Sequence, residues 1–238
     1  MLNSLFRIAK KNLDEELSSS SDYCEHFAST GLRELADYLR LNDGETHIIL
    51  DLSGGNQSTL EFFCRFDSVY LVANTRNSLA FTRINEYTES VDLNQNNYSE
   101  IFRAVLPTRI PADVSVILVW DYFNYMERFE IINLMRFLSP YCREGTKLFA
   151  ISWLTNTIPS LPSEFDLSID DNEIIYELST EHVITSPEYS AQSLVDMMPS
   201  FIPHKLSVSR SGILEVLLEF KQLEKSPNPY VIPSMKLL

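Results

Sequence analysis

Apolar residues follow two alternating patterns through the first two thirds of this 238-residue chain. Short, nearly unbroken apolar runs stand at 48–52, 69–73 and 114–120, and the stretches between and after them repeat apolar residues every three or four positions. The first pattern is typical of strands buried on both faces, and the second is typical of amphipathic helices. The alternation predicts an α/β fold with a doubly wound, mostly parallel, Rossmann-like sheet.

The clearest unit is HIILDLSGGNQSTLEFFCRFDSVYLVAN, which runs from His47 to Asn74. It predicts a strand at 48–52, a polar turn at 53–57, a helix at 58–66 and a second strand at 69–73. This is the opening β-α-β unit of a nucleotide-binding sheet, in which ligands bind beyond the carboxyl ends of the strands. A cofactor site is therefore expected at the turn.

The segments before and after this unit show the same alternation of strand and helix patterns. Helical spacing from Tyr23 to Leu41 predicts one helix, which ends at the turn sequence Asn42-Asp43-Gly44. The run VSVILVW at 114–120 predicts a central strand, because it is continuous and rich in β-branched residues. The other elements predicted in this part of the chain are helices at 77–87, 97–105 and 126–141 and strands at 90–93 and 147–154.

The alternation of strand and helix patterns ends at Pro159. Residues 159–187 hold three prolines and one predicted strand, 173–178, and are expected to form an inserted arm or lid. A helix at 190–198 then leads into two strands, which the tight Arg210-Ser211-Gly212 connection predicts to be an antiparallel hairpin. The hairpin strands are 205–209 and 213–220, and the arm's acidic cluster is Asp166, Asp170, Asp171 and Glu173.

These patterns divide the chain into three parts. Residues 1–21 predict an N-terminal helix with a flexible serine linker, residues 22–221 one domain that carries the arm, and residues 222–238 a proline-rich tail. No window of about 18 apolar residues is present, so no membrane span is expected.

The net charge and the cysteine spacing exclude several classes of partner and site. The chain has 19 basic and 33 acidic residues, a formal net charge of -14, which disfavours nucleic acid and anionic membrane surfaces as partners. Cys24, Cys64 and Cys142 are widely spaced, which indicates a reducing, cytoplasmic location and neither disulfides nor a metal site. A protein is the expected partner.

Three segments carry a resemblance to a known family: LDLSGGN, VILVWDYFNYM and SGILEVLLEF. Together with the predicted hairpin they resemble the class I S-adenosylmethionine (SAM)-dependent methyltransferases, over about residues 30–221. More narrowly, the chain is similar to uncharacterised bacterial methyltransferase-like proteins in which a DLG turn precedes an EFF-type helix and the fourth strand ends in WD-x-x-NY. The resemblance implies a methyltransferase-like sheet, SAM as cofactor and no metal.

The cofactor turn of that family is D/E-x-G-x-G-x-G, because glycines allow close backbone approach and positive φ angles. On this chain Asp51 stands at the acidic position, Ser53 replaces the first glycine, Gly55 keeps the second and Gln57 replaces the third, while Gly54 adds freedom. The resemblance implies cofactor contacts at Asp51, Ser53, Gly54 and Gly55. The alternative is a tight strand-to-helix turn without a ligand.

The family also places an acid at the end of the second strand, where its carboxylate accepts both ribose hydroxyls. Here the corresponding residues are Ala73 and Asn74. An amide oxygen accepts one such bond and its NH2 group accepts none, so a loss of about 1–3 kcal/mol is expected. Asp92 is either an adenine-side contact or an ordinary loop acid.

The loop after the fourth predicted strand is WDYFNY, and in methyltransferase-like folds this loop borders the methyl group and its acceptor. Asp121, Tyr122 and Asn124 are therefore the candidate catalytic residues. The surrounding aromatic residues either exclude water from that site or pack beneath the arm.

Two functional hypotheses follow. In the first, the chain is a methyltransferase-fold pseudoenzyme with a degenerate SAM site, which works as a binding or scaffolding module. Ser53, Gln57 and Asn74 support it, because all three depart from the family pattern. In the second, the chain is an active SAM-dependent methyltransferase that acts on a small molecule or a protein side chain.

Overall fold

A six-stranded mixed sheet forms the centre of the computed structural model, which describes residues 23–73, 95–168, 172–178, 183–209 and 212–222. The strand order is β10-β11-β5-β4-β2-β3. β2 pairs in parallel with β3 and β4, and β4 pairs in parallel with β5. β11 runs antiparallel to both β5 and β10. The strands are β2 (His47–Asp51), β3 (Ser68–Val72), β4 (Val114–Trp120), β5 (Cys142–Trp153), β10 (Phe201–Val208) and β11 (Ile213–Phe220).

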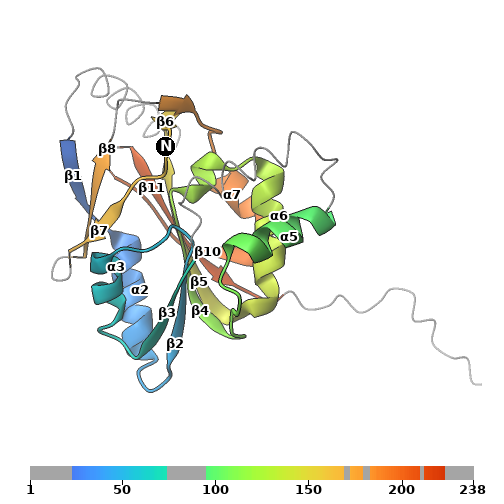
Figure 1. The fold of residues 1–238 in the computed structure, drawn as a ribbon. Helices are drawn as coiled ribbons and strands as arrows, with labels where there is room; N and C mark the ends of the chain where they lie inside the picture. The colour runs from blue at the N-terminus through green and yellow to red at the C-terminus, as the bar shows by residue number, and fades with distance from the viewer. Residues whose placement is uncertain (1–22, 74–94, 169–171, 179–182, 210–211, 223–238) are drawn as a thin grey trace, which may run out of the picture.

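Helices cover both faces of this sheet (Figure 1). One face buries Leu35 of α2 and Phe62 of α3, and the other buries Phe102 of α5, Leu134 of α6 and Leu194 of α7. The predicted fold class, a doubly wound and mostly parallel sheet with a C-terminal antiparallel hairpin, is therefore confirmed. The helices are α2 (Thr30–Leu41), α3 (Gln57–Phe63), α5 (Gln95–Val105), α6 (Arg128–Leu138) and α7 (Ala191–Met197).

Two observations explain why the central strands are buried. All seven residues of β4 are buried, as its continuous apolar run predicts. β2 lies between β3 and β4, so the chain leaves β2 to build one half of the sheet and returns on its other side for the second half. Such a reversal creates a crevice at the carboxyl ends of the two adjoining strands, the usual ligand position in doubly wound sheets.

The arm forms two small antiparallel sheets. In the larger, of order β1-β8-β7, β8 lies between an N-terminal strand and β7, and in the smaller β6 pairs with β9. The strand predicted at 173–178 is confirmed with the same bounds. These strands are β1 (Tyr23–Ala28), β6 (Thr157–Pro159), β7 (Phe165–Leu167), β8 (Glu173–Leu178) and β9 (Val183–Thr185).

The single helix predicted from Tyr23 to Leu41 is wrong in its first part. Tyr23–Ala28 is strand β1, and it pairs with β8, about 150 residues further along the chain. The helix begins only at Thr30, because Ser29 has an extended backbone and its Oγ accepts a hydrogen bond from the Leu32 amide. A long-range pairing partner, which helical spacing cannot reveal, decides the structure here.

Several predicted segments lie outside the described residues. They are the N-terminal helix and linker at 1–21, the helix at 77–87, the strand at 90–93 and most of the tail at 222–238. The short 3-10 helices Tyr122–Tyr125 and Ser139–Tyr141 complete the described elements.

Candidate functional site

The candidate site lies at the carboxyl ends of β2 and β4, where the strand order reverses. Asp51 ends β2, and the turn Leu52–Asn56 leads from it into α3. Trp120 ends β4 beside it, since the Leu52 amide donates to the Leu118 carbonyl at 2.9 Å. The site is thus predicted at the position where doubly wound sheets usually bind their ligands.

Asp51 is fully buried, and its carboxylate is occupied by neighbouring groups. Its Oδ1 accepts hydrogen bonds from the Ser53 amide at 2.8 Å, the Ser53 hydroxyl at 2.9 Å and the Trp120 indole N–H at 3.2 Å. Its Oδ2 accepts from the Tyr70 hydroxyl. Burial raises the pKa of Asp51, and these hydrogen bonds partly oppose that rise. Since the side chain has no exposed surface, no carboxylate oxygen is presented to solvent.

Trp120 fills the space between the two strand ends. Its backbone has a φ of 52°, which is rare for a bulky residue, and its side chain is almost fully buried. The indole is stacked on the Phe165 ring of β7, with ring centroids 5.3 Å apart and an interplanar angle of 11°. The Trp120 ring from the sheet and the Phe165 ring from the arm therefore pack against each other next to Asp51.

The two glycines of the turn are required by its backbone. Gly54 has a φ of 103° and Gly55 a φ of 59°. A Cβ added at Gly55 would lie 3.2 Å from both a Tyr70 ring carbon and a Val72 methyl carbon of β3, closer than most such contacts. The glycines thus let the turn pass tightly against β3, which accounts for their presence without a ligand.

The start of α3 is hydrogen-bonded to the arm. The side-chain nitrogen of Asn56, Nδ2, donates to the Phe165 carbonyl at 2.8 Å and to the Asp166 carboxylate at 2.9 Å. Ser58 donates its hydroxyl to the same Asp166 oxygen at 2.9 Å and accepts from the Leu167 amide at 3.0 Å. These bonds hold β7 against the turn that was predicted to bind the cofactor.

The three candidate catalytic residues are all buried. Asp121 accepts from the Trp153 indole at 3.2 Å and from the Ser163 amide at 3.0 Å through one oxygen, and burial raises the pKa of Asp121 from 3.8 to about 6. Asn124 accepts from the Ser152 hydroxyl at 3.1 Å. Tyr122 belongs to the core on the α5–α6 face, while Asp121 connects β5 to the arm.

Of the two alternatives for the aromatic loop, the geometry favours packing beneath the arm. Trp120 stacks on Phe165, and the Tyr125 hydroxyl donates to the Leu161 carbonyl at 2.7 Å. Atoms of Asp121, Asn124 and Ser163 remain buried without a hydrogen-bond partner: Oδ1, Nδ2 and Oγ respectively. Polar atoms left in this way fit a site that contains water, or one that was shaped for a polar ligand.

Asn74 and Asp92 lie outside the described residues, so their predicted cofactor contacts remain predictions. Sequence reasoning missed Tyr70 and Phe165, the two residues that close the site from β3 and from the arm. Tyr70 is the second residue of the strand predicted at 69–73, and its spacing of 19 residues from Asp51 does not indicate a hydrogen bond between them. In the described part of the chain, no group of three or more acidic, histidine or cysteine side chains is placed to bind a metal ion.

Comparisons with known proteins identify similar folds. No protein-family model matches the sequence, and no curated protein does. Among solved structures, a SAM-dependent methyltransferase from Clostridium acetobutylicum is 9% identical with a TM-score of 0.49, over 82% of this chain and 93% of that one. The 1,6-didemethyltoxoflavin-N1-methyltransferase of Burkholderia thailandensis, solved with S-adenosylhomocysteine, is 12% identical with a TM-score of 0.42, over 93% and 88%. The order of the described strands shows a doubly wound sheet with an antiparallel C-terminal hairpin, as the resemblance implies.

No helix in the described ranges combines the length and apolar character that crossing a bilayer requires.

Proposed function

We propose that this protein is a non-catalytic member of the methyltransferase fold, a pseudoenzyme whose SAM site is degenerate and which acts by binding another protein. One observation carries the proposal. The acid that the family places beside its cofactor is here Asp51, and it is buried under Tyr70, Trp120 and Ser53. A side chain in that state cannot present its carboxylate to a ligand without first losing these bonds.

The cofactor does not fit the residues present. SAM would need the space between the ends of β2 and β4, where the Trp120 indole lies stacked on Phe165. It would also need the turn around Gly55, which passes against Tyr70 and Val72. Displacing a stacked, buried aromatic pair costs several kcal/mol, comparable to the whole free energy of millimolar to micromolar binding. SAM is therefore not expected to bind here.

The protein-binding part of the proposal rests on the outer surface of the arm. Leu161, Val183 and Ile184 are 59%, 54% and 41% exposed there, and a protein surface is the kind of partner that covers apolar side chains. Of the arm's acidic cluster, the described members are already engaged: Asp166 accepts from Asn56 and Ser58, and Glu173 contacts His26. Apolar contact is therefore the basis we propose for partner binding.

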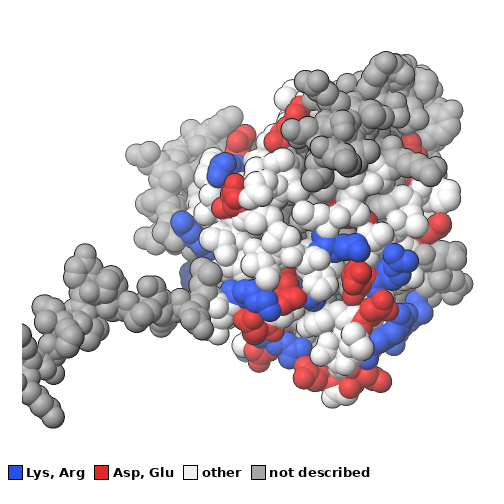
Figure 2. Space-filling view, turned by 180° about the vertical axis from the view of Figure 1, so that it is seen from behind, with Lys and Arg blue, Asp and Glu red and all other residues white. Residues whose placement is uncertain are grey.

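Nucleic acid and membrane surfaces are excluded from the proposal on charge. The net charge is -14, and basic and acidic side chains are interspersed on the face that Figure 2 shows, without an extended basic area. A phosphate backbone or an anionic bilayer requires such an area.

An active methyltransferase is the competing hypothesis. The retained Gly55 and the additional Gly54, both with positive φ angles, and the order of the six described strands favour it. In that case Asp51, Ser53, Gly54 and Gly55 would hold the cofactor, and Asp121, Tyr122 and Asn124 would border the acceptor.

Isothermal titration of the full chain with SAM and with S-adenosylhomocysteine separates the two hypotheses. The proposal expects no heat of binding at ligand concentrations up to about 1 mM, which corresponds to less than about 4 kcal/mol of binding free energy. Micromolar binding to the native chain that is lost in Gly55→Arg would overturn it. The variant Gly44→Arg, which alters another positive-φ glycine outside the site, controls for general damage to the fold.

A further inference from the structure

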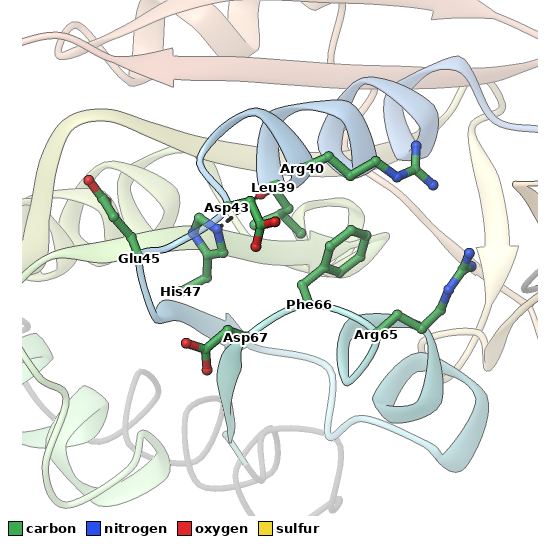
Figure 3. Close-up of a pocket in the computed structure, with 8 residues that line it drawn as sticks. All are labelled: Leu39, Arg40, Asp43, Glu45, His47, Arg65, Phe66 and Asp67. Atoms are coloured by element: carbon green, nitrogen blue, oxygen red, sulfur yellow. Dashed lines mark hydrogen bonds between the residues drawn. The ribbon is translucent and has the colours of Figure 1, made fainter.

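A second hollow lies at the opposite end of β2, between the carboxyl end of α2, the turn before β2 and the end of α3 (Figure 3). Its volume is about 200 Å³. Pockets for drug-sized ligands hold roughly 300–1,000 Å³, so this one suits a smaller molecule. Leu39 and Phe66 supply its apolar wall, and every other lining side chain is charged or is a histidine.

Two arginines stand on one side of this pocket. The guanidinium of Arg40 lies 6.0 Å from the centre of the Phe66 ring, and that of Arg65 lies 5.7 Å from the centre of the Phe62 ring. Since the two rings are themselves 6.1 Å apart, cation–π contacts hold the two guanidinium groups over one aromatic pair. The Arg40–Asp37 ion pair is half exposed and therefore weak. Paired guanidinium groups favour a carboxylate ligand.

Carboxylates stand on the other side of Phe66, as Figure 3 shows. Glu45 is paired with Arg143 at 2.9 Å. Asp67 accepts a hydrogen bond from the Thr46 hydroxyl at 3.0 Å, which leaves its charge uncompensated. Among the described residues neither Asp43 nor Asp67 forms an ion pair. These two side chains favour a ligand group that is positively charged and donates hydrogen bonds.

His47 adds a buried acceptor on the carboxylate side of the pocket (Figure 3). Its side chain is 1% exposed, and its Nε2 lies 3.2 Å from the Leu39 carbonyl oxygen. A carbonyl can only accept, so Nε2 is the donor in this contact, and in the tautomer with its proton on Nε2 the Nδ1 atom carries a lone pair. Nδ1 is buried without a partner. A buried acceptor in a pocket wall is satisfied when a ligand or a water donates to it.

We propose that this pocket binds a free α-amino acid with a small or medium apolar side chain. The ligand's carboxylate pairs with Arg40 and Arg65, its ammonium group donates to Asp43, Asp67 and His47, and its side chain lies against Leu39 and Phe66. A molecule with one charge would satisfy only one side of the pocket. This inference concerns a surface remote from the cofactor crevice and is independent of the function proposed above.

Calorimetric titration of the full chain with L-leucine and L-alanine tests the inference. At least one of them is expected to bind, and the single-charge analogues of L-leucine, 3-methylbutylamine and 4-methylpentanoate, are expected to bind at least about tenfold more weakly, since each loses one set of charged contacts. Equal binding of either analogue would contradict a site for a zwitterion. Absence of heat with both amino acids at about 10 mM, a binding free energy under roughly 3 kcal/mol, would overturn the inference entirely.

Three variants locate the binding. Arg40→Gln and Asp43→Asn are each expected to weaken binding about tenfold, from opposite sides of the pocket. Arg33→Gln is the matched control, because Arg33 is exposed on the same helix two turns before Arg40, and it should leave the affinity unchanged. An affinity that is unaffected by either pocket variant, or reduced equally by the control, would show that the amino acid binds elsewhere and would refute the site.

Discussion

The buried polar side chains at the two ends of strand β2 differ in whether their hydrogen-bonding atoms have partners within the chain. At its carboxyl end, the buried Asp51 carboxylate accepts hydrogen bonds from Tyr70 and Trp120, and the Trp120 ring stacks on Phe165. At its amino end, His47 is equally buried but keeps an unpartnered nitrogen in the wall of an open pocket. The fold usually binds its ligand at the first of these ends. Here the carboxyl end is closed, and the amino end has the open polar hollow.

The difference supports the proposal that this chain keeps the fold without the ligand crevice. The hydrogen bonds that Asp51 accepts add side-chain links between elements that meet at this end of the sheet: β2, β3, β4 and the turn into α3. Side chains at the closed end should therefore contribute much more to stability than those around the open pocket. Three substitutions test this contrast.

The largest effect is expected for Trp120→Ala. The substitution removes a buried indole, its stacking on Phe165 and one hydrogen bond to Asp51, so the free energy of unfolding should fall by about 3–5 kcal/mol in denaturant titrations. Phe66→Ala at the open pocket is the matched comparison, because the Phe66 ring is only half buried, and its cost should be less than half as large. Equal costs at the two ends would break the contrast.

A pH-dependent effect is expected for Asp121→Asn. Burial raises the pKa of Asp121 to about 6 in the folded state, against 3.8 in the unfolded chain, so the folded state holds the proton more tightly. Its stabilising contribution is complete below pH 3.8 and is lost as pH rises through about 6. The unfolding free energy of the variant relative to the native chain should therefore rise by up to about 3 kcal/mol between pH 4 and pH 7.

Denaturant titrations of both proteins across that range measure the difference directly, and the contributions of other titrating groups cancel in it. A difference that stays constant between pH 4 and pH 7 would mean that Asp121 keeps an ordinary pKa, and hence that the arm leaves it solvated.

A smaller loss is expected for Tyr70→Phe. The hydroxyl of Tyr70 donates to Asp51, and its removal leaves a buried carboxylate with one fewer donor, at a cost of about 1–2 kcal/mol. Tyr141→Phe is the control, since the Tyr141 side chain is half buried and its hydroxyl makes no hydrogen bond among the described residues. Thermal or denaturant unfolding of both variants measures the two changes in the free energy of unfolding. A cost no larger than that of the control would indicate that Asp51 does not depend on its β3 neighbour.

The sequence predicted the sheet well because its signals are local. The continuous run Val114–Trp120 and the unit His47–Asn74 each specify their elements without reference to distant residues. Strand β1 was missed because its identity depends on β8, far along the chain. The position of the cofactor site stays a prediction. The contacts of Asp51 with Tyr70 and Trp120 were not predicted, since they depend on side-chain packing between strands. Motif spacing carries no information about such packing.

The claim that the crevice is closed has one direct test. The chain contains two tryptophans, and their indole N–H groups donate to the two buried carboxylates, Trp120 to Asp51 and Trp153 to Asp121. In a ¹H–¹⁵N NMR titration with S-adenosylhomocysteine, with the two indole signals assigned through Trp153→Phe, the Trp120 signal should stay unchanged at ligand concentrations up to about 1 mM. A saturable shift of the Trp120 signal at micromolar ligand would show that the crevice opens to the cofactor and would contradict the account.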